Sequence, residues 1–266
     1  MDSPTDQLKN LLARFIPDSN QLQSAVAAVS ALQNTAGKTA HIPGANVDLD
    51  RKSRCGFPEV VYGEGKPAEL VAEIFREQQK AGQHGFATRI SPEQADVVLA
   101  EFPGARYNQT ARTLSLRDNN VTADAVVAVV SAGSCDAPVA QEAVETLHWM
   151  QVPVTFIEDV GVAGPQRLIQ HVPTLQKMNA VVCVAGMEAA LPSVLGGYVS
   201  CPVIGVPTSV GYGASLGGIT AMLSMLTCCA SNVVTVNVDA GFRGGYVAGM
   251  IARQSLPTTE ETQANG

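Results

Sequence analysis

The sequence predicts an α/β protein with a doubly wound parallel sheet, preceded by a smaller N-terminal α+β domain. In the second half, apolar segments of strand length alternate with segments of helical length. Continuous apolar strands are typical of a parallel sheet whose two faces are both covered by helices. The composition also changes near residues 118–120. The residues before this turn hold 13 of the 17 Lys and Arg, and those after it hold 16 of the 24 Gly. We therefore expect a domain boundary there.

The first half predicts a helical segment at 1–45 and a small α+β domain at 46–118. Residues 6–33 have apolar side chains at helical spacing. Turn-forming residues and a charged, glycine-bearing segment, GFPEVVYGEGK, follow. Pro67 opens a helix that runs to about Ala81 and ends at Gly82. Short strand-like pieces at 85–90, 105–109 and 112–117 complete this domain.

The second half predicts one α/β domain at 119–256. The expected strands are 125–132, 152–157, 180–185, 203–206 and 233–238. The expected helices between and after them are 137–150, 165–176, 187–198, 215–230 and 244–253. The tail at 257–266 is polar, and we expect it to be disordered.

Composition excludes several classes of protein. The formal net charge of −7 and the pI near 5.1 argue against a nucleic-acid binder. Hydrophobic residues make up 46% of the chain, yet no apolar run reaches the roughly 18 residues of a membrane span. The N-terminus lacks the layout of a secretory signal, and the six cysteines include no CxxC pair. The four histidines show no metal-ligand spacing. We expect a soluble, cytoplasmic protein that neither enters a membrane nor builds its own metal site.

The loops after the strands are the candidate ligand site, because ligands of parallel sheets bind at the carboxyl ends of the strands. These loops could hold a nucleotide with backbone N–H groups at helix N-termini. The candidate binding residues are Gly133, Ser134, Gly186, Met187, Pro207, Thr208, Ser209, Gly211, Tyr212, Gly213 and Asp239. Each loop alone also fits ordinary tight-turn chemistry. GxGxxG and the P-loop pattern GxxxxGK[ST] are both absent, so neither a Rossmann site nor a P-loop is supported.

Two carboxylates stand out in these loops. Asp136, taken alone, reads as a helix N-cap. Glu188 lies in AGMEAALP, between an apolar strand and an Ala/Leu helix. Apolar surroundings raise a carboxyl pKa and suit a general base or acid. The alternative for Glu188 is a first-turn glutamate favoured by the helix dipole.

Two neighbouring thiols and a basic group complete the candidates. Cys228 and Cys229 follow an apolar helix, where the dipole does not favour a thiolate, so activation needs a bound cation or a base. Either thiol alone also fits an inert core cysteine. Arg51, Arg54 and Lys66 belong to the densest basic group of the chain. A phosphate ligand would need these cations because the second half has few, although a solvated loop explains them equally well.

Four ordered motifs make the pattern specific. AGMEAALPSVLGG, CPVIGVPTSVGYGASLGG, MLTCCASNVVTVNVDAGF and GFPEVVYGEGK together resemble the LarB family over about 46–254. Members of this family are pyridinium-3,5-biscarboxylic acid mononucleotide synthases of nickel-pincer nucleotide biosynthesis. The C-terminal half is also similar to phosphoribosylaminoimidazole (AIR) carboxylase, through Gly133-Ser134-Cys135-Asp136 and AGMEAALPS. The resemblance implies an AIR-carboxylase-like, flavodoxin-like three-layer sheet.

The sequence departs from these patterns at a few positions. The second serine of the carboxylase loop corresponds to Cys135, and the carboxylase's histidine loop falls near 159–162, where no histidine occurs. Cys229 keeps the LarB cysteine position, whereas Cys228 replaces the usual serine before it. Arg243 stands where the family has a small residue.

The resemblance implies a carboxylase and hydrolase acting on nicotinic acid adenine dinucleotide, with CO2 or bicarbonate as the carbon source. Cys229 is the implied nucleophile and Glu188 the implied base, while Asp136 and Ser134 place the CO2. A Mg²⁺ ion carried by the substrate's phosphates would assist release of AMP, and the implied assembly is a homo-oligomer, as an octamer. Two alternatives remain open: a purine-pathway AIR carboxylase or mutase, and a nucleotide-binding module without turnover.

Overall fold

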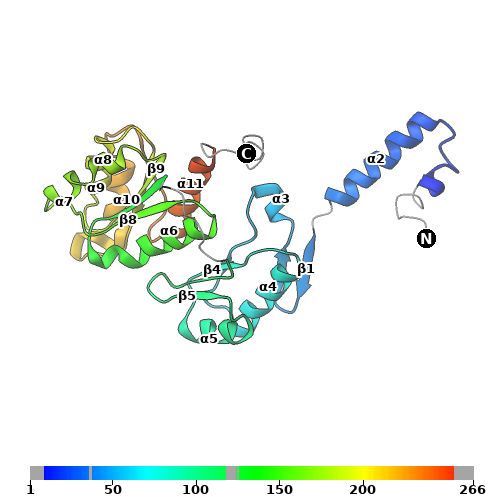
Figure 1. The fold of residues 1–266 in the computed structure, drawn as a ribbon, viewed down its shortest axis with the longest axis horizontal. Coiled ribbons are helices and arrows are strands. Elements are labelled where there is room, and N and C mark those ends of the chain that lie inside the picture. The colour runs from blue at the N-terminus through cyan, green and yellow to red at the C-terminus, as the bar shows by residue number, and fades with distance from the viewer. Residues whose placement is uncertain (1–8, 36–37, 118–123, 125, 255–266) are drawn as a thin grey trace. The chain divides into compact units, whose positions relative to one another are not determined.

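The computed structural model describes residues 9–35, 38–117, 124 and 126–254 (Figure 1). The chain divides into two compact units, Met1–Glu59 and Val60–Gly266. The domain boundary predicted at 118–120 and the tail at 257–266 lie outside the described residues. In the described part of the chain, none of the helices combines the length and the apolar character that crossing a bilayer requires.

The first unit contains helix α2 (Ser19–Thr35), strands β1 (Thr39–Ile42) and β2 (Ala45–Asp48), and helix α3 (Arg51–Cys55). The two strands form an antiparallel hairpin. Helix α3 ends at Gly56, whose positive φ of 81° is the left-handed conformation common after a helix. The helical prediction for 6–33 is confirmed for α2, whereas the hairpin and α3 lie in residues that the sequence analysis assigned to turns and loops.

The second unit begins with a four-stranded sheet in the order β3-β4-β6-β5. Its strands are β3 (Val61–Tyr62), β4 (Phe86–Thr88), β5 (Arg106–Asn108) and β6 (Thr113–Ser115), and its helices are α4 (Ala68–Lys80) and α5 (Pro92–Glu101). The sequence analysis missed α5. Ser91 and Gln94 form a capping box at its start, with a proline in the first turn, which is a readable signal for a helix N-terminus.

The larger sheet has five parallel strands in the order β11-β10-β9-β7-β8. The strands are β7 (Val127–Ser131), β8 (Val154–Ile157), β9 (Ala180–Ala185), β10 (Val203–Pro207) and β11 (Val233–Thr235). If β7 is counted as strand 1 and the sheet is followed from β8 to β11, the strand order is 2-1-3-4-5, which is the flavodoxin-like order. Every residue of β7, β9 and β10 is buried, as the continuous apolar runs predict. The prediction of a doubly wound parallel sheet is confirmed.

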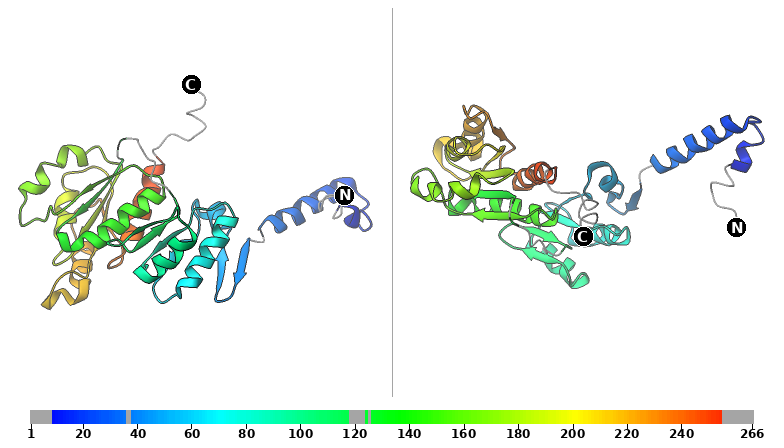
Figure 2. Two further views of the ribbon diagram at one scale, coloured as in Figure 1. Left: turned by 60° about the horizontal axis from the view of Figure 1, so that its bottom comes forward. Right: turned by 45° about the horizontal axis from the view of Figure 1, so that its top comes forward.

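Helices cover both faces of this sheet (Figure 2). Helices α6 (Ala137–Trp149) and α11 (Gly241–Arg253) pack together on one face. A Cβ on Gly245 would come within 2.6 Å of the Ala143 carbonyl, so this close approach requires a glycine. The other face carries α7 (Gln166–Ile169), α8 (Val172–Leu175), α9 (Leu191–Gly196) and α10 (Ile219–Leu226). The helices predicted at 165–176, 187–198 and 215–230 are therefore shorter or broken.

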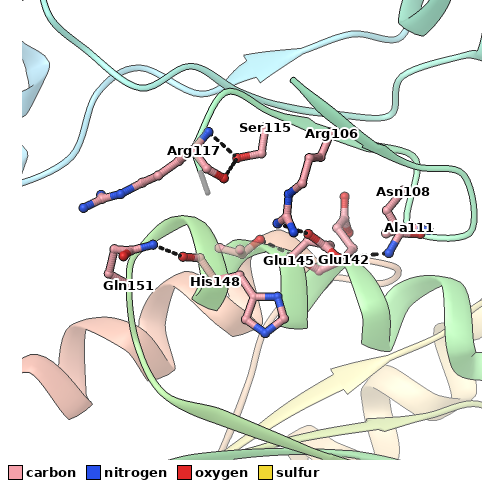
Figure 3. Close-up of polar contacts among 10 residues, drawn as sticks. Arg106, Asn108, Ala111, Ser115, Arg117, Glu142, Glu145, His148 and Gln151 are labelled. Atoms are coloured by element: carbon pink, nitrogen blue, oxygen red, sulfur yellow. Dashed lines mark hydrogen bonds and ion pairs between the residues drawn. The ribbon is translucent and has the colours of Figure 1, made fainter. Parts of the chain in front are cut away.

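The small sheet and helix α6 are held together by aromatic and polar contacts. The rings of Trp149 and Phe86 stack with centroids 5.2 Å apart, and the Trp149 indole N–H donates to the His84 carbonyl at 2.9 Å. Asn108 Nδ2 donates to Glu145 Oε1 at 3.0 Å, as Figure 3 shows. The second unit therefore joins the four-stranded and five-stranded sheets into one body.

Candidate functional site at the carboxyl ends of the strands

A pocket of about 380 Å³ lies beyond the carboxyl ends of β7 and β9. Four loops line it: the loops after β7, β8 and β9, and the loop after β10, which contributes Val210. Of the sequence-predicted site residues, the pocket contains Gly133, Ser134, Asp136, Gly186, Met187 and Glu188. The parallel topology thus brings together residues that lie far apart in the sequence.

Asp136 is the buried acid of this pocket, with only 3% of its surface exposed. It occupies the N-cap position of α6, but its side chain does not cap that helix. Instead, Oδ1 accepts a hydrogen bond from the Thr208 hydroxyl at 2.6 Å and Oδ2 accepts one from the Gly133 N–H at 2.9 Å. Burial raises the pKa of Asp136, while hydrogen bonds from Thr208, Gly133 and Gly186 oppose that rise. A buried acid with a raised pKa at a pocket is suited to proton exchange.

The loop after β9 is strained around Glu188. Met187 and Ala189, on either side of it, have φ values of 53° and 49°, which non-glycine residues rarely adopt. Such strain concentrates at functional sites. Before them, Gly186 has no room for a side chain, since a Cβ would lie 2.6 Å from Thr208 Oγ1 and would clash with the Val210 carbonyl oxygen.

The expectation that Glu188 lies in apolar surroundings is wrong. Its side chain is exposed, because the chain turns outward at 187–188 and α9 does not begin until Leu191. Glu188 is therefore neither a buried carboxylate nor a first-turn helix residue. It stands at the mouth of the pocket, where a bound ligand could cover it.

The loops after β10 and β11 meet beside Asp136. Asp239 Oδ1 accepts a hydrogen bond from the Ser209 N–H at 2.8 Å, and the Asp239 N–H donates to the Pro207 carbonyl at 2.8 Å. Asp239 also has a positive φ of 55°. The remaining predicted residues of this loop, Gly211, Tyr212 and Gly213, follow Ser209, and Tyr212 is 82% exposed. Pro207, Thr208, Ser209 and Asp239 are thus at the same edge of the sheet as the pocket.

Arg89, a residue that the sequence analysis missed, reaches this edge from the small sheet. Its guanidinium donates to the Asp239 carbonyl oxygen and lies 3.4 Å from Glu142 Oε1. Glu142 is almost fully buried and accepts a hydrogen bond from the Phe242 N–H at 3.1 Å. Burial raises the pKa of Glu142, and the Arg89 charge opposes the rise. This network joins the loop after β11 to the small sheet.

One arginine at the pocket was not among the cations that the sequence analysis favoured. Arg167 lines the pocket, with its Nη1 2.7 Å from Asp159 Oδ2. Arg51 and Arg54 belong to the first unit, where Arg54 forms ion pairs with Asp48 and with Asp50. Lys66, in the second unit, lies in the turn before α4.

Cys229 lies at the other edge of the sheet. A Cβ on Gly218, just before α10, would be 2.7 Å from the Thr208 carbonyl, so α10 starts at the carboxyl ends. After Cys229, Asn232 Nδ2 donates to the Val199 carbonyl at 3.0 Å, just before β10 begins. Helix α10 therefore runs back across the sheet and leaves Cys229 at the amino ends. The five residues of β10, at about 3.3 Å each, separate the two edges by roughly 16 Å.

Within the described residues, no group of three or more His, Cys, Asp or Glu side chains is arranged to hold a metal ion. Asp136 and Asp239 are the acids of the loops around Thr208, and both already accept hydrogen bonds from this edge. A divalent cation at this edge would therefore need oxygen ligands from a bound molecule.

Comparison with known proteins gives the family. Residues 39–118 match the family model of the LarB/PurE-like N-terminal domain, and residues 126–265 match the model of AIR carboxylase. The chain belongs to the LarB family. It is 37% identical to an uncharacterized protein of Methanocaldococcus jannaschii over 219 residues, covering 78% of this chain and 83% of that relative. The resemblance to LarB and to AIR carboxylase read from the motifs is confirmed.

Two further likenesses each cover about half of this LarB-family chain. It is 28% identical over 138 residues to the N5-carboxyaminoimidazole ribonucleotide mutase of Pyrococcus abyssi, covering 51% of this chain and 78% of that protein. A crystal structure of a PurE2 variant from Treponema denticola has 13% identity and a TM-score of 0.40, with 54% of this chain and 93% of that chain covered.

Proposed function

We propose that this LarB-family chain carboxylates nicotinic acid adenine dinucleotide with CO2 and then hydrolyses its phosphoanhydride. The products are pyridinium-3,5-biscarboxylic acid mononucleotide and AMP, in the synthesis of the nickel-pincer nucleotide. Family membership supports the enzyme class. The observation that carries the proposal is the pocket itself, where a buried acid of raised pKa, Asp136, faces the strained loop of Glu188.

The proposed carboxylation needs a nucleophile and a base, because carbon 5 of a pyridinium ring does not attack CO2. The Cys229 thiolate adds to carbon 4, and the electron pair moves to the ring nitrogen to give an enamine. Carbon 5 then attacks CO2 and forms the new C–C bond. Glu188 removes the proton from carbon 5. The thiolate then leaves carbon 4, and the ring becomes an aromatic, positively charged pyridinium again.

Other residues of the pocket position the reactants in this proposal. Asp136, held by Thr208 and Gly133, orients the CO2 together with Ser134. Arg167, which lines the pocket, pairs with the carboxylate of the ring in this proposal. The glycine-bearing loop at Gly211 and Gly213 brings backbone N–H groups to the same edge, where they suit phosphate oxygens.

A Mg²⁺ ion would enter with the substrate in this account. The carboxylates at the carboxyl ends of the strands, Asp136 and Asp239, already accept hydrogen bonds. They therefore suit a cation that takes most of its oxygen ligands from phosphates, as Mg²⁺ commonly does. When bound, the ion withdraws charge from the phosphoanhydride and so eases attack by water. Asp239 accepts a hydrogen bond from Ser209, just before the glycine-bearing loop, and is the residue we expect to contact the hydrated ion.

Two relatives are named N5-carboxyaminoimidazole ribonucleotide mutase. These names favour a second candidate function, that of a purine-pathway carboxylase or mutase. The loop at 159–162 has no histidine, so an imidazole acid or base is absent there. Parallel incubations with the dinucleotide plus bicarbonate and with N5-carboxyaminoimidazole ribonucleotide separate the candidates. Formation of the dicarboxylated mononucleotide supports our proposal, and isomerisation of the ribonucleotide alone would replace it with the second candidate.

A further inference from the structure

Two adjacent thiols, those of Cys228 and Cys229, follow helix α10, and the proposed reaction uses only the second. Helix α10 ends at Leu226 and strand β11 begins at Val233, so both cysteines lie in a connection that is neither helix nor strand. Cys229 is exposed and Cys228 is half-buried. An exposed thiol is open to oxidation, and a neighbouring thiol decides which product that oxidation gives.

The connection between α10 and β11 is held at both of its ends. At its start, the Thr227 hydroxyl donates to the Leu223 carbonyl at 2.7 Å. At its end, Asn232 Nδ2 donates to the Val199 carbonyl at 3.0 Å. Because the backbone is anchored on either side of the two thiols, an oxidised Cys229 must find its partner close by.

We propose that Cys228 and Cys229 form a reversible redox site, in which hydrogen peroxide converts the two thiols into a disulfide between adjacent residues. Cys229, the exposed thiol, reacts with the peroxide, and Cys228 closes the bond. The redox site itself is independent of the proposed function. Its effect on turnover rests on that function, because Cys229 is the proposed nucleophile.

The oxidation has two steps and consumes one molecule of hydrogen peroxide. The Cys229 thiolate attacks one peroxide oxygen and the O–O bond breaks. The departing hydroxide takes up the proton that the thiol lost and becomes water, and Cys229 becomes a sulfenic acid. The Cys228 sulfur then attacks the Cys229 sulfur, the S–O bond breaks, and the hydroxyl group leaves with the Cys228 proton as a second water. The two sulfurs together lose the two electrons that the peroxide gains.

Other thiols of the second unit are less suited to this reaction. Cys183 and Cys201 are buried, and burial raises the pKa of both thiols, so they stay protonated and react slowly. Cys135 lines the pocket at the carboxyl ends of the strands, on the opposite edge of the sheet from Cys229. Cys228 is therefore the thiol that the structure offers to an oxidised Cys229.

The resulting disulfide should be easy to reduce. The α-carbons of adjacent residues lie about 3.8 Å apart across a trans peptide bond, closer than the roughly 4.4–6.8 Å of most disulfides. Strain of this kind makes a disulfide more oxidising and more labile. A disulfide returns to two thiols, whereas a sulfinic acid does not. Cys228 would thus protect the Cys229 thiol from irreversible oxidation.

Peptide mapping of the full-length chain tests the redox site without any turnover. After peroxide treatment the remaining thiols are alkylated, and the chain is cleaved with chymotrypsin, which cuts after Leu226 and Phe242. The peptide 227–242 contains Cys228 and Cys229 and no other cysteine. We expect this peptide without alkylation and lighter by two hydrogen atoms, and doubly alkylated if dithiothreitol is added first. Two alkylated thiols after peroxide, or a bond to a peptide that holds Cys201, would overturn the proposal.

Cys228→Ser removes the second thiol and keeps the first. With excess peroxide, Cys229 of this variant should proceed to the sulfinic acid, which dithiothreitol does not reduce, while the wild type recovers both thiols. Cys55→Ser is the matched control and should behave as the wild type, because Cys55 is also exposed but lies in the other compact unit. Equal recovery of the Cys229 thiol in the wild type and in Cys228→Ser would overturn the protective role of Cys228.

Turnover of the same samples separates this proposal from the proposed function. Peroxide should stop formation of the dicarboxylated product by the wild type, and dithiothreitol should restore it, whereas the Cys228→Ser variant should stay inactive. A disulfide that forms while turnover continues would remove Cys229 from the proposed reaction and leave the redox site standing. Normal turnover of the reduced protein, with no disulfide after peroxide, would overturn the redox site and leave the proposed function standing.

Discussion

Replacing Thr208 with valine should destabilise the protein in a way that depends on pH. Thr208 is fully buried, and its hydroxyl donates to Asp136 Oδ1 at 2.6 Å. Valine preserves the shape of the side chain but leaves a buried carboxylate with one donor fewer. Hydrogen bonds to charged groups contribute about 1.5–3 kcal/mol, so we expect a loss of about 2 kcal/mol in the free energy of unfolding at neutral pH.

The loss should shrink as the pH falls. Burial raises the pKa of Asp136 in the folded protein, and the Thr208 hydroxyl opposes that rise, so the variant has a still higher pKa. Because the folded pKa lies above the unfolded one, stability from this group is fully present below the unfolded pKa and is lost as the pH rises through the folded pKa. The difference between variant and wild type is therefore largest above the raised pKa of Asp136 and smallest once Asp136 is protonated.

Thermal unfolding followed by circular dichroism over a series of pH values measures this effect. For a unit of this size, about 2 kcal/mol corresponds to a fall in Tm of about 4–8 °C at neutral pH. Thr146→Val is the matched control, because that buried hydroxyl donates to the Glu142 backbone carbonyl at 2.7 Å and not to a carboxylate. An equal loss of stability at every pH, or no loss at neutral pH, would refute the role assigned to Thr208.

Four further substitutions test the site. Cys229→Ser should abolish formation of the dicarboxylated product in a mass-spectrometric assay, since an alcohol is a far poorer nucleophile than a thiolate. Cys228→Ser should retain most activity. The reverse pattern would make Cys228 the nucleophile. Glu188→Gln should lower turnover by about 10²-fold or more with the fold intact, and near wild-type turnover would leave Glu188 without a catalytic role. Gly186→Ala should lower the free energy of unfolding in urea by about 1–3 kcal/mol, the usual cost of overpacking. Its Cβ would clash with the Val210 carbonyl, and an unchanged midpoint would contradict that close approach.

The five-stranded sheet could be predicted because its signal is local. Strands buried on both faces leave continuous apolar runs such as Ala180–Ala185, and short glycine-bearing loops follow them. The same alternation also indicates where Cys229 lies, since it follows a helix and precedes a strand and so falls at the amino ends.

The missed features depend on contacts that no local pattern records. Residues 187–190 read as the start of a helix, but the chain turns through left-handed residues there and exposes Glu188. Arg89 and Asp239 are 150 residues apart in the sequence, and their contact follows from the packing of the small sheet against α6. Asp136 was found as a candidate, but its partner Thr208, 72 residues away, gives it its buried setting.

The most direct test of the account is one incubation of the purified full-length chain. Nicotinic acid adenine dinucleotide, Mg²⁺ and ¹³C-labelled bicarbonate are supplied, and the products are resolved by mass spectrometry. The account predicts a pyridinium mononucleotide with a second carboxyl group that carries the label, together with an equal amount of AMP, and neither product from the Cys229→Ser variant. Release of AMP without incorporation of label, or labelled product from the Cys229→Ser variant, would contradict it.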